Sequence, residues 1–233
     1  MHPLTATFDA GRARLARNPA IAALADPDTP VSAKLAVVPT MAFWVLGFGD
    51  AMALLRRTSG TTPLDEVVKQ HASEDADHWK WFVADLEALA SQSIGVRSMS
   101  AAYTDLWGPT NAAVRECAWT LHHLLRMHSD PVTRLAILEA CEHGFEVFMD
   151  SIRPVVQEAG QYGELLYLGE QHDHAEAGHA LHEGADPFDD LDWSGQDVEM
   201  LRGVIDTIYE CLDGMHTCYA TAIAAARERE QVC

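Results

Sequence analysis

The stretch that decides the fold is PVTRLAILEACEHGFEVFMDSIRPVVQE, residues 131–158. Its apolar side chains recur at steps of three and four residues, which is the period of one face of an α-helix. The residues that mark this face are Leu135, Leu138, Cys141, Phe145, Phe148 and Ile152. We therefore predict one helix over residues 131–159 that buries this face in a core.

In the rest of the chain, prolines and glycines stand where helices would begin and end. The alternation of apolar and polar residues that is typical of a strand is nearly absent. Proline stands at a predicted first helical turn in Thr62-Pro63, Gly108-Pro109 and Asp130-Pro131, and glycine marks predicted helix ends at Gly60, Gly160 and Gly184. The predicted helices span residues 4–24, 31–58, 63–92, 99–128 (with a break at Pro109 left open), 131–159, 164–184 and 195–230. Helices of this length in 233 residues must pack side by side. We predict an all-α, seven-helix bundle that forms a single domain over residues 1–233.

The charge and the cysteines limit the class of partner. With 35 acidic and 16 basic residues the net charge is −19, which repels phosphate backbones and anionic lipid. We expect no nucleic-acid and no membrane partner, but a small molecule or a metal ion. The five cysteines show no CxxC pair and are expected as buried thiols in a reducing cytoplasm. The apolar run over 35–55 contains proline, glycine and aspartate, so we expect a central helix of a globular domain there.

The segment GEQHDHAEAGHALHEG, residues 169–184, has the residues of a metal site. His172, Glu176 and His179 follow the pattern H-x3-E-x2-H. On a helix that advances about 100° per residue these side chains share one face. Imidazole nitrogen and carboxylate oxygen together suit Fe, Mn or Zn.

Two other predicted helices carry similar residues. His71, Glu74 and His78 share a helix face, on which we expect Asp75 to point elsewhere. Glu142 lies near the middle of the otherwise apolar helix over 131–159. A carboxylate there is costly to bury unless it is paired or bound to metal. We therefore predict that all seven of these residues are metal ligands.

This spacing resembles that of the haem-oxygenase-like di-iron oxidases and oxygenases, which share their fold with the TenA thiaminases and with PqqC, the pyrroloquinoline quinone synthase. In that family a Glu and a His on the third helix, a Glu on the fifth, and H-x3-D/E-x2-H on the sixth bind the metals. The resemblance spans nearly the whole chain. It assigns His78 to the third helix, Glu142 to the fifth and His172, Glu176 and His179 to the sixth.

One position departs from the family pattern. The third-helix Glu of the family stands two turns before the His, where this chain has His71. Either His71 is a ligand in place of the acid, or Glu74, one turn before His78, takes the role. A His in place of a Glu removes one negative charge and weakens the hold on a second divalent ion. One metal ion instead of two is therefore an open alternative.

The resemblance implies that two Fe(II) ions, or Mn in their place, activate dioxygen to oxidise a small molecule. The expected reaction is N-oxygenation or oxidative C–C cleavage of an amino acid or amine. A homodimer is the oligomeric state common among such relatives. Other residues are candidates for orienting the ligands, for contact with a substrate carboxylate or for lining an apolar pocket, with an exposed or core position as the alternative for each: Asp50, Asp75 and Asp173; Lys80, Arg115, Arg126 and Arg134; Phe43, Trp44, Phe48, Trp119 and Phe145.

Three other functions stay open from the sequence. A metal-free TenA-like enzyme would use Cys141 as nucleophile with Glu210 as its acid. A ferritin-like di-iron protein would use the E-x-x-H pair Glu176 and His179 and its D-x-x-H relative Asp75 and His78. Asp50 or Glu66 and Glu142 would be its remaining acids, and His172 would be idle. In a binding or scaffold protein without enzymatic activity, the histidines would have no role as ligands and the acidic charge would serve solubility.

Overall fold

The computed structural model describes residues 2–91, 99–176, 187–189 and 191–232, and at residues 91, 99, 176 and 232 the backbone alone. All regular secondary structure in these residues is helical, which confirms the predicted all-α class. The α-helices are α1 (Thr5–Leu15), α2 (Pro19–Ala25), α3 (Val31–Leu35), α4 (Val38–Leu55), α5 (Pro63–Asp75), α6 (His78–Ser91), α7 (Met99–Trp107), α8 (Ala112–Met127), α9 (Pro131–Glu158), α10 (Glu170–Glu176) and α11 (Val198–Val232). Short 3-10 helices are η1 (Pro109–Asn111) and η2 (Trp193–Gly195).

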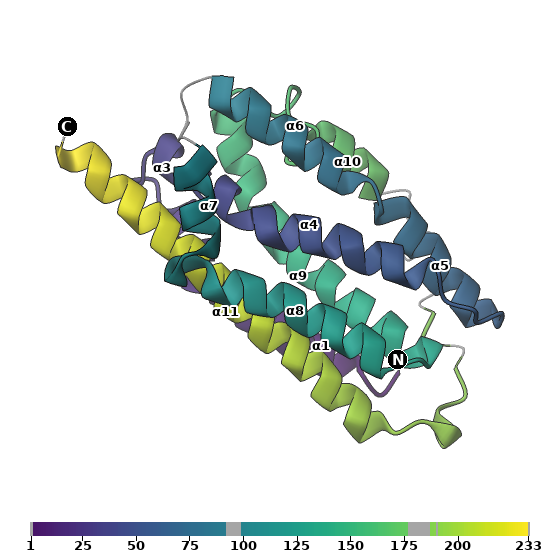
Figure 1. Cartoon of the computed structure of the whole chain (residues 1–233). Coiled ribbons are helices and arrows are strands. Elements are labelled where there is room, and N and C mark those ends of the chain that lie inside the picture. Colours follow the sequence, from purple (N-terminus) through teal and green to yellow (C-terminus); the bar gives the residue numbers. More distant parts are fainter. Residues whose placement is uncertain (1, 92–98, 177–186, 190, 233) are drawn as a thin grey trace.

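Three long helices organise the bundle (Figure 1). The helix α11 packs against α8, α9 and α1 along one side of the molecule. The helix α4 runs through the middle and contacts α8, α5 and α6, while α9 contacts α5, α1 and α11. The helices α6 and α10 lie together on the side opposite α11. Helices from distant parts of the sequence thus enclose a common centre.

Local signals fix several helix ends. Thr62 begins α5 with a capping box, in which its hydroxyl accepts from the amide of Asp65 and the Asp65 carboxylate accepts from the amide of Thr62. Asp130 caps α9 by accepting from the amide of Thr133. Gly160, with a φ of 69°, takes the left-handed conformation after α9. These ends confirm the boundaries that proline and glycine marked in the sequence.

Two of the predicted helices are divided near prolines, although the prediction continued each helix past its proline. The helix predicted over 4–24 breaks at Asn18, whose side chain caps α2, and Pro19 is the first residue of α2. The helix predicted over 31–58 breaks into α3 and α4, and Pro39 lies in the first turn of α4. Proline lacks the amide hydrogen that a helix interior needs and is suited to the first turn. Continuous helices over these ranges were therefore a wrong prediction.

Two further helices differ from the prediction. The helix predicted over 63–92 divides where α5 ends at Asp75 and α6 begins at His78. Neither proline nor glycine marks this break. The helix predicted over 164–184 begins at Glu170, after a series of turns.

The other predictions of secondary structure are close to the structure. The break left open at Pro109 is present, because α7 ends at Trp107 and α8 begins at Ala112 after η1. The helix predicted over 195–230 is α11. A count of seven helices is too low, since several of them are helix pairs with a break between.

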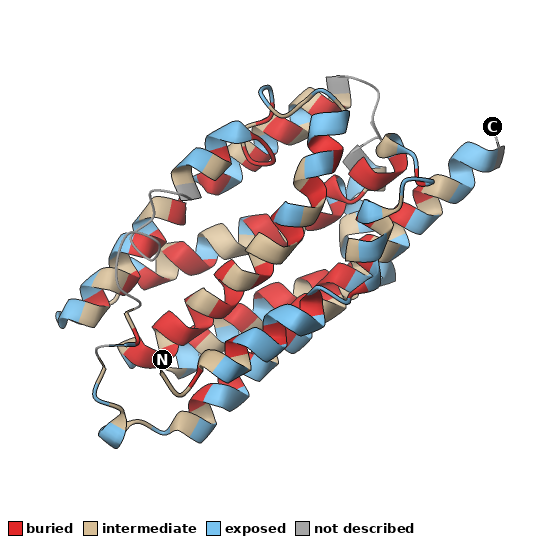
Figure 2. Cartoon of the chain, turned by 180° about the vertical axis from the view of Figure 1, so that it is seen from behind, coloured by how far each residue is buried: buried red, intermediate tan, exposed pale blue. Residues whose placement is uncertain are grey.

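Buried side chains form one contiguous core along the inner faces of the helices, and the exposed residues lie outside (Figure 2). The segment Val31–Leu55 is long and apolar enough to cross a membrane by length and composition. It is interrupted between α3 and α4, and 56% of its most apolar window is buried inside the protein. This burial is typical of the core helix of a globular protein.

A matched pair of glycine variants tests the packing of α1 on α11. A Cβ at Gly11 would lie 2.1 Å from the ring of buried Tyr209, whereas a Cβ at Gly203 of α11 would meet nothing within 4 Å. Gly11→Ala should lower the free energy of unfolding by about 1–3 kcal/mol through overpacking. Gly203→Ala should raise it by about 0.5–1 kcal/mol through helix propensity. Urea unfolding measures both, and equal effects would contradict this packing.

Candidate metal centre

The centre of the bundle holds three buried ionisable side chains. Nε2 of His71 lies 3.0 Å from Oδ2 of Asp75 and 3.3 Å from Oε1 of Glu142. The exposed fractions of these residues are 0, 3 and 5%. One potential ligand atom from each lies within 4.8 Å of those of the other two. This spacing allows the three side chains to surround one metal ion.

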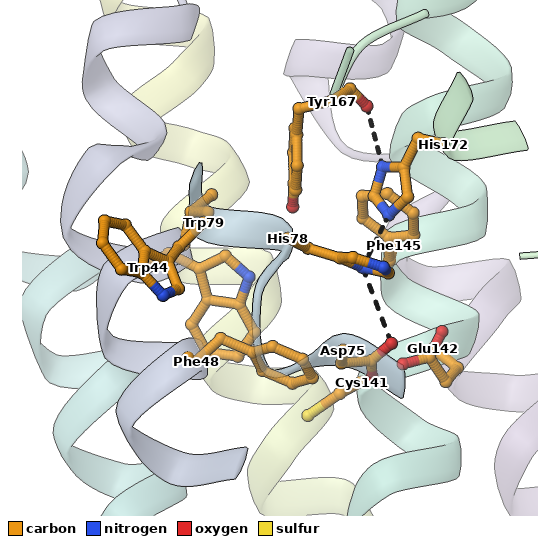
Figure 3. Close-up of a pocket in the computed structure, with 12 residues that line it drawn as sticks. Trp44, Phe48, Asp75, His78, Trp79, Cys141, Glu142, Phe145, Tyr167 and His172 are labelled. Atoms are coloured by element: carbon orange, nitrogen blue, oxygen red, sulfur yellow. Dashed lines mark hydrogen bonds and ion pairs between the residues drawn. The ribbon is translucent and has the colours of Figure 1, made fainter. Parts of the chain in front are cut away.

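Two more imidazoles extend this cluster (Figure 3). Nδ1 of His78 lies 3.6 Å from Oδ1 of Asp75 and 3.1 Å from Nε2 of His172. Asp75 thus directs one oxygen toward His71 and the other toward His78. Together with Glu142 these residues form a continuous series of donor atoms from α5, α6, α9 and α10, which we call the five-residue cluster.

Helix geometry explains why these side chains converge. His71 and Asp75 are four residues apart on α5, which places them about 40° apart around the helix axis and on its inner face. Asp75 is the last residue of α5 and His78 the first of α6, so the break between the helices lies at the cluster. Glu142 comes from the middle of α9, and His172 comes from the first turn of α10.

A backbone contact fixes which nitrogen of His172 faces the cluster. Its Nδ1 lies 2.7 Å from the carbonyl oxygen of Tyr167, and a carbonyl can only accept, so this nitrogen donates. In the neutral ring the lone pair is then on Nε2, which faces His78. An imidazole oriented in this way by a carbonyl is the form that binds metal.

Buried Asp85 of α6 holds the segment that carries this carbonyl. Its carboxylate accepts from the amides of Leu166, Tyr167 and Leu168 at 2.6, 3.0 and 2.9 Å. Burial raises the pKa of Asp85, and the three amide donors act against that rise. Asp85 therefore positions His172 through the backbone. Sequence reasoning missed Asp85, since nothing local to α6 indicates contact with a segment some eighty residues later.

Asp173 anchors α10 from the other side of His172. Arg153 of α9 donates two hydrogen bonds to its carboxylate at 2.7 and 2.9 Å, and the hydroxyl of Tyr162 donates a third at 2.5 Å. Although partial burial acts to raise it, these donors leave the pKa of Asp173 below its ordinary value. The ionised carboxylate ties α10 to α9, which agrees with the supporting role predicted for Asp173.

The charge of His71 responds to its two neighbours. Burial alone disfavours the imidazolium, but Asp75 and Glu142 raise the pKa of His71 well above its ordinary value. A protonated His71 offsets part of the negative charge of the two carboxylates. The centre of the protein is thus a place where a positive charge is stabilised.

The structure brings four of the seven predicted ligands together. The four are His71, His78, Glu142 and His172. Among the described residues Glu74 is not part of this group, and one oxygen of its carboxylate accepts from Gln70. Asp75, which we expected to point elsewhere, takes the inner position. A spacing of four residues from His71 was the signal for Asp75, and it places Asp75 closer to the direction of His71 than Glu74 at three residues.

The remaining two predicted ligands cannot be placed by side chain. Glu176 is the last residue of α10, and its side chain is outside the described residues. His179 lies wholly outside them. Both stay predicted ligands.

A cavity of about 440 Å³ adjoins the five-residue cluster (Figure 3). Asp75, His78, Glu142 and His172 form its polar wall. The rest of the lining is mainly aromatic and includes Trp44, Phe48, Trp79, Phe145 and Tyr167. Trp44, Phe48 and Phe145 thus line a pocket as predicted.

Two other aromatic residues expected at a pocket lie elsewhere. Phe43 and Trp119 pack against Trp107, and Trp119 is exposed. They therefore belong to the outer surface of α4 and α8.

The predicted cationic contacts to a substrate are not formed by the described residues. Lys80 pairs with Asp77 at 2.7 Å on the surface, and Arg126 is exposed. Arg115 and Arg134 donate to backbone carbonyls. Among the described residues that line the cavity none is lysine or arginine. The cavity therefore offers no cation from this part of the chain to a substrate carboxylate.

The structure also bears on the alternative sites. Cys141 lines the cavity, but burial raises the pKa of its thiol well above the ordinary value, which disfavours the nucleophilic thiolate. Glu210, the acid that a TenA-like enzyme would use, lies on the surface beside Arg14. The thiol mechanism thus lacks its predicted acid.

The ferritin-like alternative needs Asp50 or Glu66 at the centre. Asp50 is exposed, and Glu66 pairs with Lys69 at the surface. His172, which that alternative leaves idle, lies within the cluster. The ligand geometry therefore favours the site predicted from the H-x3-E-x2-H pattern.

A comparison with models of protein families found no match, and neither did a comparison with curated proteins. The family resemblance inferred from the ligand spacing therefore stays a prediction.

Replacing Asp85 by Asn tests the support of His172. An Asn side chain has one acceptor oxygen and places a donor against an amide donor. Asp85→Asn should lower the free energy of unfolding by about 2–4 kcal/mol, because hydrogen bonds to a buried charged group are lost. The matched change Asp77→Asn, at an exposed carboxylate, should alter it by less than about 0.5 kcal/mol. Urea unfolding at pH 7 measures both values, and a harmless Asp85→Asn would contradict the role of Asp85.

Proposed function

We propose that this protein is a non-haem iron oxidase or oxygenase that uses dioxygen to oxidise a small molecule. The cofactor in this proposal is a pair of Fe(II) ions, with Mn(II) as the alternative. The donor set supports the proposal, since it combines three imidazoles with two carboxylates in a buried site. This is the mixture of ligands that suits iron and manganese. A haem-oxygenase-like arrangement of the helices is part of the same proposal.

The position of Asp75 is the observation that carries the proposal of two ions. Its two oxygens face different groups, with His71 and Glu142 on one side and His78 and His172 on the other. A carboxylate between two sets of donors can bind one ion through each oxygen. Glu176 and His179 would complete the second set. Asp75 would thereby supply the negative charge that His71 does not provide in place of the family's Glu.

The residues of the chain itself would bind the metal and the small molecule, orient the imidazoles and exclude water. Ferrous iron, when bound, supplies the electrons that reduce dioxygen. Hydrogen bonding to Tyr167 holds the ring of His172 with Nε2 toward the site, and stacking on Trp81 holds the ring of His78. The aromatic wall of the cavity keeps bulk water from the reacting groups. A small molecule in the cavity would lie directly beside His78 and His172.

Binding of iron and its reaction with dioxygen test the function. Anaerobic Fe(II) at about 100 times its Kd should raise the free energy of unfolding by about 2.7 kcal/mol. After air is admitted, the iron-loaded protein should consume dioxygen faster than the same Fe(II) in buffer, as measured with an oxygen electrode. Glu142→Ala removes a ligand and should abolish most of both effects.

The control for this experiment is His123→Ala, on the exposed face of α8, which should behave as the wild type. Equal stabilisation of Glu142→Ala and the wild type by Fe(II) would show that iron binds elsewhere. A protein that binds iron at the cluster without consuming dioxygen would refute the oxidative function.

Neighbouring carboxylates on α5 test the role of Asp75. Asp75→Asn should reduce the iron retained after gel filtration from two ions to one per chain, because one anionic bridge is lost. Glu74→Gln, one residue earlier and outside the cluster, should retain two. Iron analysis of the two variants gives the answer. Loss of iron in Glu74→Gln but not in Asp75→Asn would reverse our assignment.

A further inference from the structure

A second cavity, with about 300 Å³ of free space including the part open to solvent, lies next to the first. The two cavities share four lining residues, which shows that they adjoin: Trp44, Cys141, Phe145 and Tyr167. The second cavity continues toward α11, where His216 and Tyr219 form part of its wall. A ligand that extended from the first cavity past these shared residues would reach α11.

His216 is an unusual residue for the wall of an apolar cavity. Its exposed fraction is 1%, and its Nδ1 has no hydrogen-bond partner among the described residues. Its ring packs against the rings of Phe148 and Tyr219, with centroids 5.7 and 5.5 Å away. A buried polar atom without a partner destabilises a fold, and native proteins keep few of them. A ligand that hydrogen-bonds to His216 would explain its presence.

The electrostatics of the second cavity favour an uncharged ligand. Burial lowers the pKa of His216 to about 4, although nearby Asp213 acts to raise it, so the imidazole is neutral at pH 7. None of the described residues that line this cavity is lysine, arginine, aspartate or glutamate. A charged group placed there would lose its hydration without a counter-charge. A neutral imidazole can donate through one nitrogen and accept through the other.

We infer that the second cavity binds the far end of an uncharged, mainly apolar molecule through a hydroxyl, carbonyl or amide group that hydrogen-bonds to His216. The apolar part of this molecule lies between Trp44 and Phe145, where the two cavities join. Its other end reaches the five-residue cluster. That this molecule is the substrate rests on the proposed function, whereas the binding site does not depend on iron.

Two probes of equal length test the inference in the full chain purified without metal: hexan-1-ol and hexanoate. Hexan-1-ol should bind, and hexanoate should bind at least tenfold more weakly because its charge has no partner. Isothermal titration gives the affinities. In protein labelled with [15N]histidine, the ring signals missing from His216→Leu identify His216, and hexan-1-ol should shift them.

Variants at His216 separate binding from folding. His216→Leu should weaken hexan-1-ol about fivefold through the loss of one hydrogen bond, and His216→Asn, which keeps an uncharged polar group, should restore part of the affinity. Because His216→Leu removes a polar atom without a partner, its Tm should equal or exceed that of the wild type. The matched control His123→Leu, at an exposed site, should leave binding unchanged.

Two results would overturn the inference. One is equal affinity of the wild type and His216→Leu for hexan-1-ol, and the other is a preference for hexanoate. A large drop in Tm of His216→Leu would show that His216 serves folding instead. Since these measurements use protein without iron, they can fail while the iron test succeeds, and the reverse also holds.

Discussion

Negative charge at the centre of a helical bundle is the constraint on which this structure depends. Glu142 lies on the buried side of α9, whose other buried side chains are mostly apolar, and Asp75 faces it from α5. Two carboxylates removed from water are tolerated only when a cation or hydrogen-bond donors compensate them. His71 lies within 3.3 Å of both and has a raised pKa for that reason. A cluster of this kind is a poor way to stabilise a fold, since apolar residues of the same size would do so better. Its presence is therefore best explained by the binding of a cation.

Residues from several helices hold the backbone segments that carry the five-residue cluster. Asp85 holds three successive amides of the segment before α10, and the carbonyl of Tyr167 in that segment orients His172. Arg153 binds Asp173 and so connects α10 to α9. These contacts join protein groups to one another. In the proposed metal site they would hold the imidazole of His172 in its ligand orientation, which would reduce the conformational entropy that binding costs.

Sequence periodicity predicted what depends on local chemistry. The extent of α9, its cap at Asp130 and its end before Gly160 follow from apolar spacing and from proline and glycine. A partner for Glu142 was predicted because a buried acid needs one, and His71 was one of the candidates left open.

What depends on contacts between distant residues was out of reach of this reasoning. The break between α5 and α6 carries no proline or glycine, so the prediction ran one helix through it. The expectation that Asp75 points elsewhere was wrong for a different reason, because positions three and four residues from His71 both lie near its direction and the smaller deviation of Asp75 was overlooked. Asp85 and His216 act on partners on other helices or on a ligand, and a residue's own helix gives no sign of that.

The helix α9 lines both cavities and sets the distance between the residues that it contributes to each. Glu142 faces the first cavity and Phe148 the second, and the rise of about 1.5 Å per residue over their six-residue separation gives about 9 Å. Phe145 lies between them and lines both cavities. Because a buried helix within a packed core is rigid, this distance is fixed by the fold. Ionisable donor atoms stand at one end of the joined cavities and the neutral imidazole of His216 at the other. A molecule bound along this line would present one end to the ionisable cluster, and its length would select which of its atoms reacts.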